Sequence, residues 1–387
     1  MVENAVKAVR LNYVRKRNVK VILDLLYAKP YSCAELAELT KLSSAAVNKI
    51  LKQLISLGII KKVSIFLKKK SVGGQHIRYQ IAGNAGALIC VDFTHFRDVA
   101  VIYDLSGKEL FRKKYTFNYP DSVIYEKDIR LIVDELKEEV NKLDIDVYCV
   151  SLCVPGQIDS ETNSFIISGK FNYLKDDFTY RIFSETFNCK VIIKNNVQMM
   201  AIGEYNYGNL MSKYNTSIYI YAGYGLAACS LYKGEIISGW RGYSGEIGGN
   251  RFNVISPLSL KCSLMRILER LQDHLERKDV SCLIESFQTN EYVHNEVIET
   301  AKILASEIVN MTNLIGADVV VISGESLQFG DDYINTIRDY LHKYCIPEMK
   351  VFPAKLKDSA IKGGLELGRI YVFEQILDLK ANYLNNA

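Results

Sequence analysis

Paired cysteines and long apolar runs are both missing from this chain of 387 residues. Its 9 cysteines are scattered without a C-x-x-C pair, and several lie inside apolar runs. Reduced, buried thiols are therefore a better interpretation than disulfides or metal ligands. No apolar run reaches the ~18 residues that span a bilayer, and the first residues lack the apolar core of a signal peptide. We expect a cytoplasmic protein that does not associate with membranes.

Acidic residues are scarce at the N-terminal end. Residues 1–82 contain 16 Lys and Arg against 4 Asp and Glu, a net charge of +12, whereas residues 83–387 contain 32 against 40, a net charge of −8. The formal total of +4 conceals this difference. Such asymmetry is typical of a nucleic-acid-binding segment attached to a neutral or acidic body. We expect the basic segment to bind a polyanion.

Residues 1–82 have the pattern of a helix-turn-helix domain. Apolar residues at helical spacing predict a first helix that ends before Pro30, because proline cannot continue it. A capping box at residues 32–35 opens a short second helix. Ser43 then caps a third helix, and Gly58 supplies its left-handed stop.

After the third helix the pattern changes to that of a β-hairpin. Residues 59–67 and 75–81 alternate like strands, and three lysines and two glycines between them form a basic, flexible tip. A hairpin in this position is the wing of a winged helix-turn-helix domain. Order, spacing and charge together favour binding of double-stranded DNA over a generic three-helix bundle with solvated lysines. Residues 83–86 are interpreted as the linker to the rest of the chain.

The candidate DNA contacts lie on the outward face of the third helix and on the wing. Small residues at the start of a recognition helix allow close approach to the groove, while Asn and Lys side chains reach base edges and phosphates. Wing residues reach the minor groove and nearby phosphates. The candidates are Ser43, Ser44, Ala45, Asn48, Lys49, Lys52, Lys68, Lys69, Lys70, Gln75, His76 and Arg78.

Residues 87–387 are predicted to form an α/β body in two lobes. In the first half three antiparallel strands lead to a helix and to further buried strands, and a strand-rich second half repeats this theme. Such a repeat predicts two lobes with a cleft between them. The predicted strands cover residues 88–92, 99–104, 108–117, 147–154 and 190–194 in the first half and 216–221 and 227–233 in the second.

Six segments occur in an order that resembles the ROK family of repressors and sugar kinases. They are Asp92, Val154-Pro155-Gly156, Asn195-Asn196 with Gly203-Glu204, Gly223-Tyr224-Gly225, Gly245-Glu246-Ile247-Gly248 and residues 319–324. Together with the basic segment, which looks like the winged helix of the repressor branch, they cover nearly the whole chain. The resemblance implies an actin-like body of two ribonuclease-H-like halves that binds a sugar in its cleft, plus an operator-binding domain.

Kinases of the family carry their catalytic base as an Asp after Asn, where this sequence has Asn195-Asn196. The carboxamide of Asn196 can hydrogen-bond a sugar hydroxyl, but it has no ionised form with which to accept the proton. The Gly-rich phosphate turn of the kinases is replaced by Phe93-Thr94-His95 after Asp92, and these side chains obstruct close approach of the backbone to phosphate. We expect no catalytic residue, no enzyme activity and no cofactor.

Family members commonly carry a His directly after Gly-Glu-Ile-Gly and three nearby Cys, which together hold a structural zinc ion. Here Gly249 stands in place of that His, and Cys262 is the only thiol between residues 250 and 271. We therefore expect no metal site, and we interpret His274 and His294 as ordinary surface or core residues. The expected packing anchors of the loop are Phe252, Ile255 and Leu258.

The polar residues that the resemblance assigns to sugar binding are Asn172, Asn195, Asn196 and Glu246. Amide and carboxylate groups suit a polyol, since they pair with adjacent hydroxyls, and an aromatic ring can cover the C–H face. Tyr173 and Trp240 are the ring candidates. In the alternative interpretation, Asn195-Asn196 only turns a loop and Glu246 only caps a helix.

The sequence thus favours a transcriptional regulator, a repressor of carbohydrate genes with a catalytically inactive, sugar-sensing body. We expect it to bind an inverted-repeat operator as a homodimer or higher homo-oligomer, with the effector shifting the spacing of two recognition helices. Two alternatives stay open. One is an active ROK sugar kinase fused to a DNA-binding domain, and the other is a constitutive DNA-binding dimer with no small-molecule effector.

Overall fold

The computed structural model describes residues 2–65, 76–94, 98–117, 124–159, 161–162, 164–171, 174, 177–251, 256–345 and 349–384. By its packing the chain divides into two compact units. Unit 1 comprises residues 1–152, 173–192 and 365–387, and unit 2 comprises residues 153–172 and 193–364. The helix-turn-helix segment therefore packs in one unit with the first half of the body, while the predicted domain boundaries at residues 82 and 86 stay a prediction.

The N-terminal segment forms three helices and a two-stranded hairpin, in the order predicted. Ser32 Oγ accepts a hydrogen bond from the Glu35 N–H at 3.3 Å while Glu35 accepts one from the Ser32 N–H at 2.7 Å, and Gly58 has the left-handed φ of +72°. The capping box and the glycine stop are therefore confirmed. The elements are α1 (Val2–Ala28), α2 (Cys33–Thr40), α3 (Ser44–Ser56), β1 (Ile60–Ile65) and β2 (His76–Ile81).

The segment interpreted as a linker is a packed turn. Residues Gly83–Ala85 form a 3₁₀ helix, and the carbonyls of Gly83 and Gly86 accept hydrogen bonds from the Leu105 N–H at 3.4 and 3.0 Å. A Cβ atom on Gly83 would lie 2.2 Å from the Asp104 carboxylate, so a larger residue there would require the Asp104 side chain to move. The connection is thus fixed against the end of a strand in unit 1.

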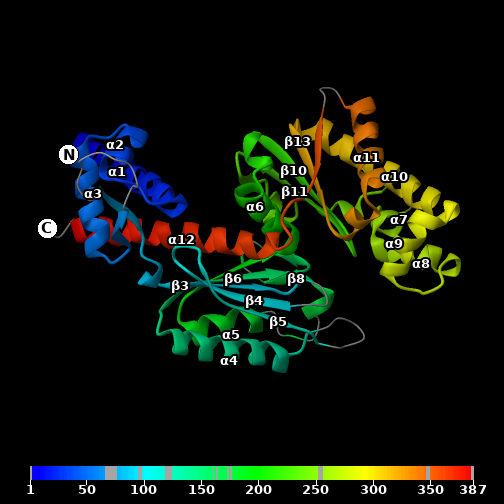
Figure 1. The fold of residues 1–387 in the computed structure, drawn as a ribbon, viewed down its shortest axis with the longest axis horizontal. Coiled ribbons are helices and arrows are strands. Elements are labelled where there is room, and N and C mark those ends of the chain that lie inside the picture. The colour runs from blue at the N-terminus through cyan, green and yellow to red at the C-terminus, as the bar shows by residue number, and fades with distance from the viewer. Residues whose placement is uncertain are drawn as a thin grey trace. The chain divides into compact units, whose positions relative to one another are not determined.

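The sheet of unit 1 has five strands in the order β5-β4-β3-β6-β9, with β3, β4 and β5 antiparallel as predicted. Figure 1 shows α4 and α5 on one face of this sheet and α12 on the other. A Cβ atom on Gly368 of α12 would lie 3.3 Å from Leu88 of β3, which shows how closely the helix approaches the sheet. The bounds are β3 (Ala87–Asp92), β4 (Asp98–Asp104), β5 (Glu109–Tyr115), α4 (Glu126–Leu143), β6 (Val147–Val154), α5 (Phe178–Phe187), β9 (Lys190–Asn195) and α12 (Ser359–Leu384).

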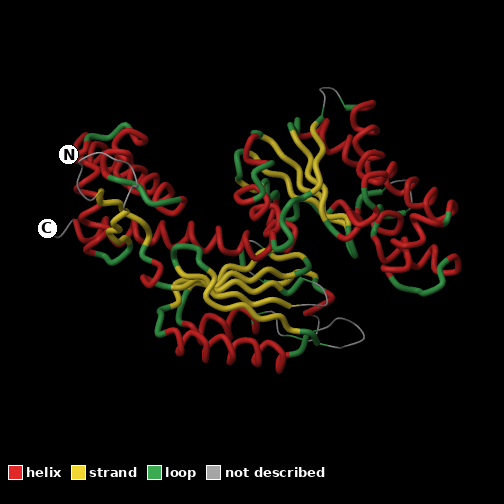
Figure 2. The backbone as a smooth tube through the Cα atoms, in the orientation of Figure 1, coloured by secondary structure: helices red, strands yellow, loops and turns green. Residues whose placement is uncertain are grey.

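The sheet of unit 2 repeats this strand order as β12-β11-β10-β13-β14, and both sheets appear as yellow strands in Figure 2. Along β10, Ile218 and Ile220 pack into one buried cluster, whereas Tyr219 and Tyr221 pack into the other. This alternation buries both faces of the sheet. The bounds are α6 (Asn196–Tyr207), β10 (Thr216–Ala222), β11 (Leu226–Tyr232), β12 (Glu235–Ile236), α10 (Glu291–Ile315), β13 (Val319–Ser323), α11 (Asp331–Tyr344) and β14 (Lys350–Pro353).

Smaller elements complete unit 2. The short strands β7 and β8 pair in antiparallel fashion, and three helices precede α10 and contribute to the larger buried cluster. Among the residues that the structure describes, no helix is both long and apolar enough to cross a membrane. The bounds are β7 (Gln157–Ile158), β8 (Phe165–Ile167), α7 (Ser259–Cys262), α8 (Leu264–Leu271) and α9 (Val280–Thr289).

Helix α6 meets the start of α12 through two glycines. A Cβ atom on Gly203 would lie 1.9 Å from the Ser359 carbonyl oxygen, and one on Gly363 would lie 1.9 Å from the Met199 carbonyl oxygen. The buried carboxylate of Glu204 accepts hydrogen bonds from the backbone N–H groups that lead into α12, at 3.0 and 3.1 Å. The Gly203-Glu204 pair of the sequence pattern is therefore an architectural joint.

We predict that Gly203→Ala destabilises the protein, because its new methyl group meets backbone that cannot rotate away. The expected loss is about 1–3 kcal/mol of unfolding free energy, measured by urea denaturation. Gly249→Ala is the matched control, since no atom lies within 4 Å of a Cβ at that position. Equal unfolding free energies of the two variants would contradict the close packing of α6 on the start of α12.

Candidate functional site

The predicted recognition face of α3 is exposed. Val47, Ile50, Leu51 and Leu54 are buried against the other helices, whereas Ser43, Ser44, Ala45, Asn48, Lys49 and Lys52 are all exposed. Ser43 also caps the helix, since its hydroxyl accepts a hydrogen bond from the Ala46 N–H at 3.2 Å. The side chains that are to meet DNA therefore share one surface.

Of the predicted DNA contacts on the wing, only the side chain of Arg78 lies within the described residues. Lys68, Lys69, Lys70 and Gln75 lie outside the described residues, and so does the side chain of His76. Arg78 is engaged within the domain, where it donates to the Pro30 carbonyl at 2.9 Å and pairs with the Glu35 carboxylate at 2.6 Å. Its guanidinium fastens β2 to the start of α2, and contact of Arg78 with DNA stays a prediction.

Three cations that the sequence analysis did not select are exposed in the same domain. Lys61 and Lys62 lie on β1, and Lys41 lies in the turn between α2 and α3. Lys41 has a left-handed φ of 58°, so the turn presents its side chain directly before the recognition helix. The net charge of +12 was the available signal for them, because it counts cations without placing them.

Asn195 has a structural role in unit 2. Its Oδ1 caps α6 by accepting hydrogen bonds from the N–H groups of Val197 and Gln198, at 2.8 and 3.4 Å. Its Nδ2 donates to the Gly156 carbonyl at 2.6 Å. Both ends of the amide are thus used by the fold, as the loop-turning alternative expects, and sugar contact by Asn195 stays a prediction.

Asn196 and Glu246 are the remaining described candidates for sugar contact, because Asn172 lies outside the described residues, as does Tyr173. Asn196 is 7% exposed at the start of α6. Glu246 makes no helix-capping hydrogen bond, which removes the capping alternative for it. Although Glu246 as a residue is exposed, the protein atoms around its carboxyl group raise the pKa of Glu246 by partial desolvation, and an interaction with Gln157 opposes this shift.

One segment, residues 156–159, connects these groups. Its Gly156 carbonyl accepts a hydrogen bond from the Asn195 amide, its Gln157 side chain opposes the rise in the pKa of Glu246, and its Asp159 carboxylate pairs with Arg241. Candidates far apart in sequence are thereby brought to a common strip of backbone within unit 2. The structure therefore gathers Asn195, Glu246 and Arg241 around this segment, and sugar contact by Asn196 stays a prediction.

The ion pair between Asp159 and Arg241 was missed from sequence. Asp159 is 2% exposed, and its carboxylate also accepts hydrogen bonds from the N–H groups of Glu161 and Thr162, at 2.8 and 3.3 Å. The bond from Glu161 and the guanidinium of Arg241 hold the pKa of Asp159 below its ordinary value. Asp159 therefore fixes Arg241, which has a left-handed φ of 49°.

Beside Arg241 stands an open aromatic surface. Trp240 is 73% exposed, its ring stacks on Tyr243 with centroids 5.7 Å apart, and the guanidinium of Arg241 lies 5.4 Å from its ring centroid. An exposed indole stacked on a second ring offers a flat apolar face of the kind that covers sugar C–H groups. Because it is exposed, Trp240 stays the candidate for covering the C–H face of a sugar.

The segments that resemble nucleotide-binding turns are filled by the chain itself. After β3, the Asp92 carboxylate accepts hydrogen bonds from the backbone N–H and the hydroxyl of Thr94, and Phe93 is fully buried. In unit 2, Glu325 accepts a hydrogen bond from the Tyr221 hydroxyl at 2.9 Å. A Cβ atom on Gly223 would lie 2.0 Å from the Glu325 carboxylate. A negative group thus lies against the Gly223-Tyr224-Gly225 turn.

The residues considered as zinc ligands are engaged elsewhere. Cys262 is buried, its thiol donates to the Thr300 carbonyl at 3.7 Å, and burial raises the pKa of Cys262 to about 12. His274 packs on the Tyr292 ring and His294 on the Phe287 ring, with centroids 4.4 and 4.5 Å apart. Of the loop anchors, Leu258 is buried, while Phe252 and Ile255 lie outside the described residues. No cluster of metal-ligating side chains occurs among the described residues.

Comparison with known proteins decides the family. The model of the ROK family matches residues 88–367, and a model of winged helix-turn-helix DNA-binding domains matches residues 17–61. The chain belongs to the ROK family. It is 22% identical over 373 residues to a Caldicellulosiruptor protein named as a candidate xylose repressor, covering 88% of this ROK chain and 91% of that protein. The N-acetylglucosamine repressor of Shigella flexneri is 22% identical over 322 residues, covering 76% and 77%.

Solved structures agree on the ROK fold. A ROK family transcriptional regulator, a homologue of the E. coli MLC protein, superposes with a TM-score of 0.78 at 16% identity and covers 95% of this chain and 98% of its own. A ROK hexokinase from Thermus thermophilus gives a TM-score of 0.62 at 15% identity, covering 74% and 99%. The predicted fold class, a winged helix-turn-helix domain followed by an actin-like α/β body, is confirmed.

We predict that Asp159→Asn lowers the melting temperature at neutral pH. Because the folded pKa of Asp159 is lowered, its contribution to stability is present above the ordinary value of 3.8 and is lost as the pH falls through the folded value. The difference in melting temperature between wild type and variant should therefore narrow in calorimetric scans as the pH falls through the folded pKa of Asp159. Asp339→Asn, at an exposed site on α11, should show no such narrowing. A constant difference across the pH range would argue against the pairing.

Proposed function

We propose that this ROK protein is a DNA-binding transcriptional regulator, a repressor of carbohydrate genes, whose body senses a sugar or sugar derivative without phosphorylating it. The observation that carries the proposal is the exposed polar face of α3, which presents small residues, Asn48, Lys49 and Lys52 while its apolar face is buried. Two named relatives along most of the chain are repressors by name, one a candidate.

In the DNA-bound form, α3 lies in the major groove and its lysines neutralise phosphates. We place Asn48 at a base edge and Lys49 and Lys52 at the backbone, with Lys61 and Lys62 of β1 as additional phosphate contacts. A homodimer reads an inverted repeat, because two recognition helices about 34 Å apart match half-sites one turn of DNA apart. The wing lysines Lys68, Lys69 and Lys70 and their neighbours Gln75 and His76 contact the flanking minor groove.

In the body, the effector sugar contacts Asn172, Asn196 and Glu246, with Trp240 against its C–H face. The assignment is supported by the placement of Glu246 and of Asn195, the neighbour of Asn196, around residues 156–159. Asn195 positions this loop by capping α6. A carboxylate and two amides provide the donors and acceptors that a polyol requires.

Phosphoryl transfer is disfavoured at three places. Asn196 stands where the kinases of the family have their base, and a carboxamide cannot take up the proton of the hydroxyl. The turn after β3 is closed by the bonds between Asp92 and Thr94. The carboxylate of Glu325 lies against Gly223, where it would repel a nucleotide phosphate. The active-kinase alternative predicts sugar phosphate from purified protein, ATP and hexose, and we expect none.

The body can communicate with the DNA-binding domain through α12. This helix begins in unit 2 and continues into unit 1, where Arg369 pairs with Asp24 of α1 at 2.5 Å. Tyr27 of α1 also meets the Phe373 ring edge-on, with centroids 6.3 Å apart. An effector that prefers one conformation of the body would then reach the recognition helix through α12, the helix that is continuous with both units in sequence.

We predict that Lys49→Ala and Lys52→Ala each weaken binding to duplex DNA and reduce the slope of log affinity against log salt by about one counterion. Fluorescence anisotropy with labelled promoter fragments at several salt concentrations measures both quantities. Lys213→Ala, at an exposed site of unit 2, is the control and should leave the slope unchanged. Unaltered slopes in the two α3 variants would exclude their contact with phosphate.

We predict that Glu246→Ala abolishes the stabilisation by sugar while DNA affinity stays the same, because the carboxylate and α3 belong to different units. In wild type, a cognate sugar at 100 times its dissociation constant should add about 2.7 kcal/mol of stability. A melting screen with mono- and disaccharides and their phosphates measures the shift. Glu235→Ala, at an exposed position of β12, should respond like wild type. If no sugar shifts the wild-type melting temperature, the constitutive DNA-binding alternative holds.

A further inference from the structure

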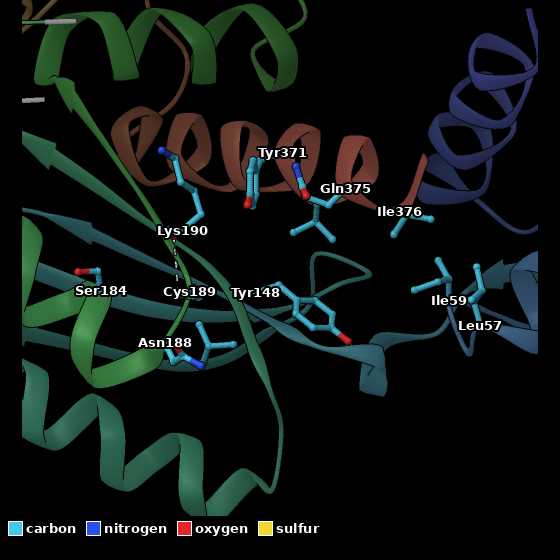
Figure 3. Close-up of a pocket in the computed structure, with 12 residues that line it drawn as sticks. Leu57, Ile59, Tyr148, Ser184, Asn188, Cys189, Lys190, Tyr371, Gln375 and Ile376 are labelled. Atoms are coloured by element: carbon cyan, nitrogen blue, oxygen red, sulfur yellow. Dashed lines mark hydrogen bonds between the residues drawn. The ribbon is translucent and has the colours of Figure 1, made fainter. Parts of the chain in front are cut away.

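A cavity of about 710 Å³ lies within unit 1, where the helix-turn-helix segment meets the first sheet and α12. Figure 3 shows its walls: Leu57 and Ile59 come from either side of Gly58 at the end of α3, Tyr148 comes from β6, and Tyr371 and Gln375 come from α12. The volume is within the range of about 300–1,000 Å³ that is typical of sites for small molecules. None of the candidate sugar contacts lines it.

The two ends of this cavity differ in polarity. Leu57, Ile59 and Ile376 form an apolar end, and Ser184, Asn188 and Lys190 lie at the opposite end in Figure 3. Lys190 is the only charged residue in the lining, and it forms no ion pair among the described residues. With a cation at one end and aliphatic side chains at the other, the cavity complements a ligand that has an anionic group at one end and an apolar group at the other.

We propose that this junction cavity binds a small organic anion with an apolar body, at a site distinct from the sugar site. Lys190 meets the anionic group, and the hydroxyls and amides of Tyr148, Tyr371 and Gln375 line the middle of the cavity. A free sugar does not suit this cavity, because its hydroxyls would lose their hydrogen bonds to water against Leu57 and Ile59. A ligand with one charged group and an aromatic or aliphatic remainder satisfies both ends.

The position of the cavity gives such a ligand access to the recognition helix. Leu57 is the C-terminal cap of α3, and its N–H donates to the Gln53 carbonyl at 3.2 Å. A ligand in contact with Leu57 and with Ile376 therefore touches both α3 and α12. This regulatory consequence rests on the proposed DNA-binding function, whereas the binding site itself does not.

The test uses anilinonaphthalene sulfonate, an aromatic sulfonate, as the probe and isothermal titration calorimetry of the full chain without DNA. We expect one site in the wild type. Gln375→Trp should weaken binding roughly tenfold or more, because an indole in place of an exposed amide fills the cavity. Glu374→Trp is the matched control, since Glu374 is exposed on the same helix and does not line the cavity. Equal binding to both variants would overturn the proposal.

A second pair of variants tests the charge. Lys190→Gln should weaken binding of the probe about threefold and reduce its dependence on salt, whereas Lys213→Gln should change neither. Circular dichroism of each variant verifies the fold. Absence of binding to the wild type, or equal affinity in Lys190→Gln, would overturn the site. These measurements need no DNA, so a failure of the duplex-binding experiments would remove the proposed function and leave this result standing.

Discussion

The packing of α1 on α12 in unit 1 depends on one partly buried cation, Arg369. The guanidinium of Arg369 is 12% exposed and lies between Glu366 of its own helix and Asp24 of α1, with both N···O distances at 2.5 Å. A charge taken out of water is tolerated only when its partners are close and well oriented, and removal of one partner leaves the other charge uncompensated. The pair therefore specifies where α1 sits on α12. The contact joins the first helix of the DNA-binding segment to α12, the helix that also lines the junction cavity.

Local signals in the sequence were sufficient to predict the helices and strands. They did not predict which distant side chains pair. The capping box at Ser32, the stop at Gly58 and the exposed face of α3 follow from residues within a few positions of one another. Arg78 appeared to be a free wing cation because its partner Glu35 is 43 residues away, and the link between Asp159 and Arg241 spans 82 residues. Composition and spacing do not encode which side chains meet across such separations.

The candidate sugar site shows the same limit within a single motif. Asn195 and Asn196 are adjacent and chemically identical, and the sequence analysis assigned both to sugar binding. The fold separates them, because the first amide is consumed by the helix cap and by the Gly156 carbonyl, while the second begins the helix. Glycine patterns were similarly ambiguous. In the sequence Gly203 is part of a family segment, yet whether a side chain fits at this position is decided by the Ser359 carbonyl, far along the chain.

The carboxylate of Glu325 beside Gly223 limits what a single substitution at the candidate sugar site could do. A single codon change at Asn196 could bring back a proton acceptor, but a nucleotide would still encounter a negative side chain at the turn. Under the proposed function, an Asp at position 196 would therefore not by itself give phosphoryl transfer, so variation at that position leaves the body a receptor.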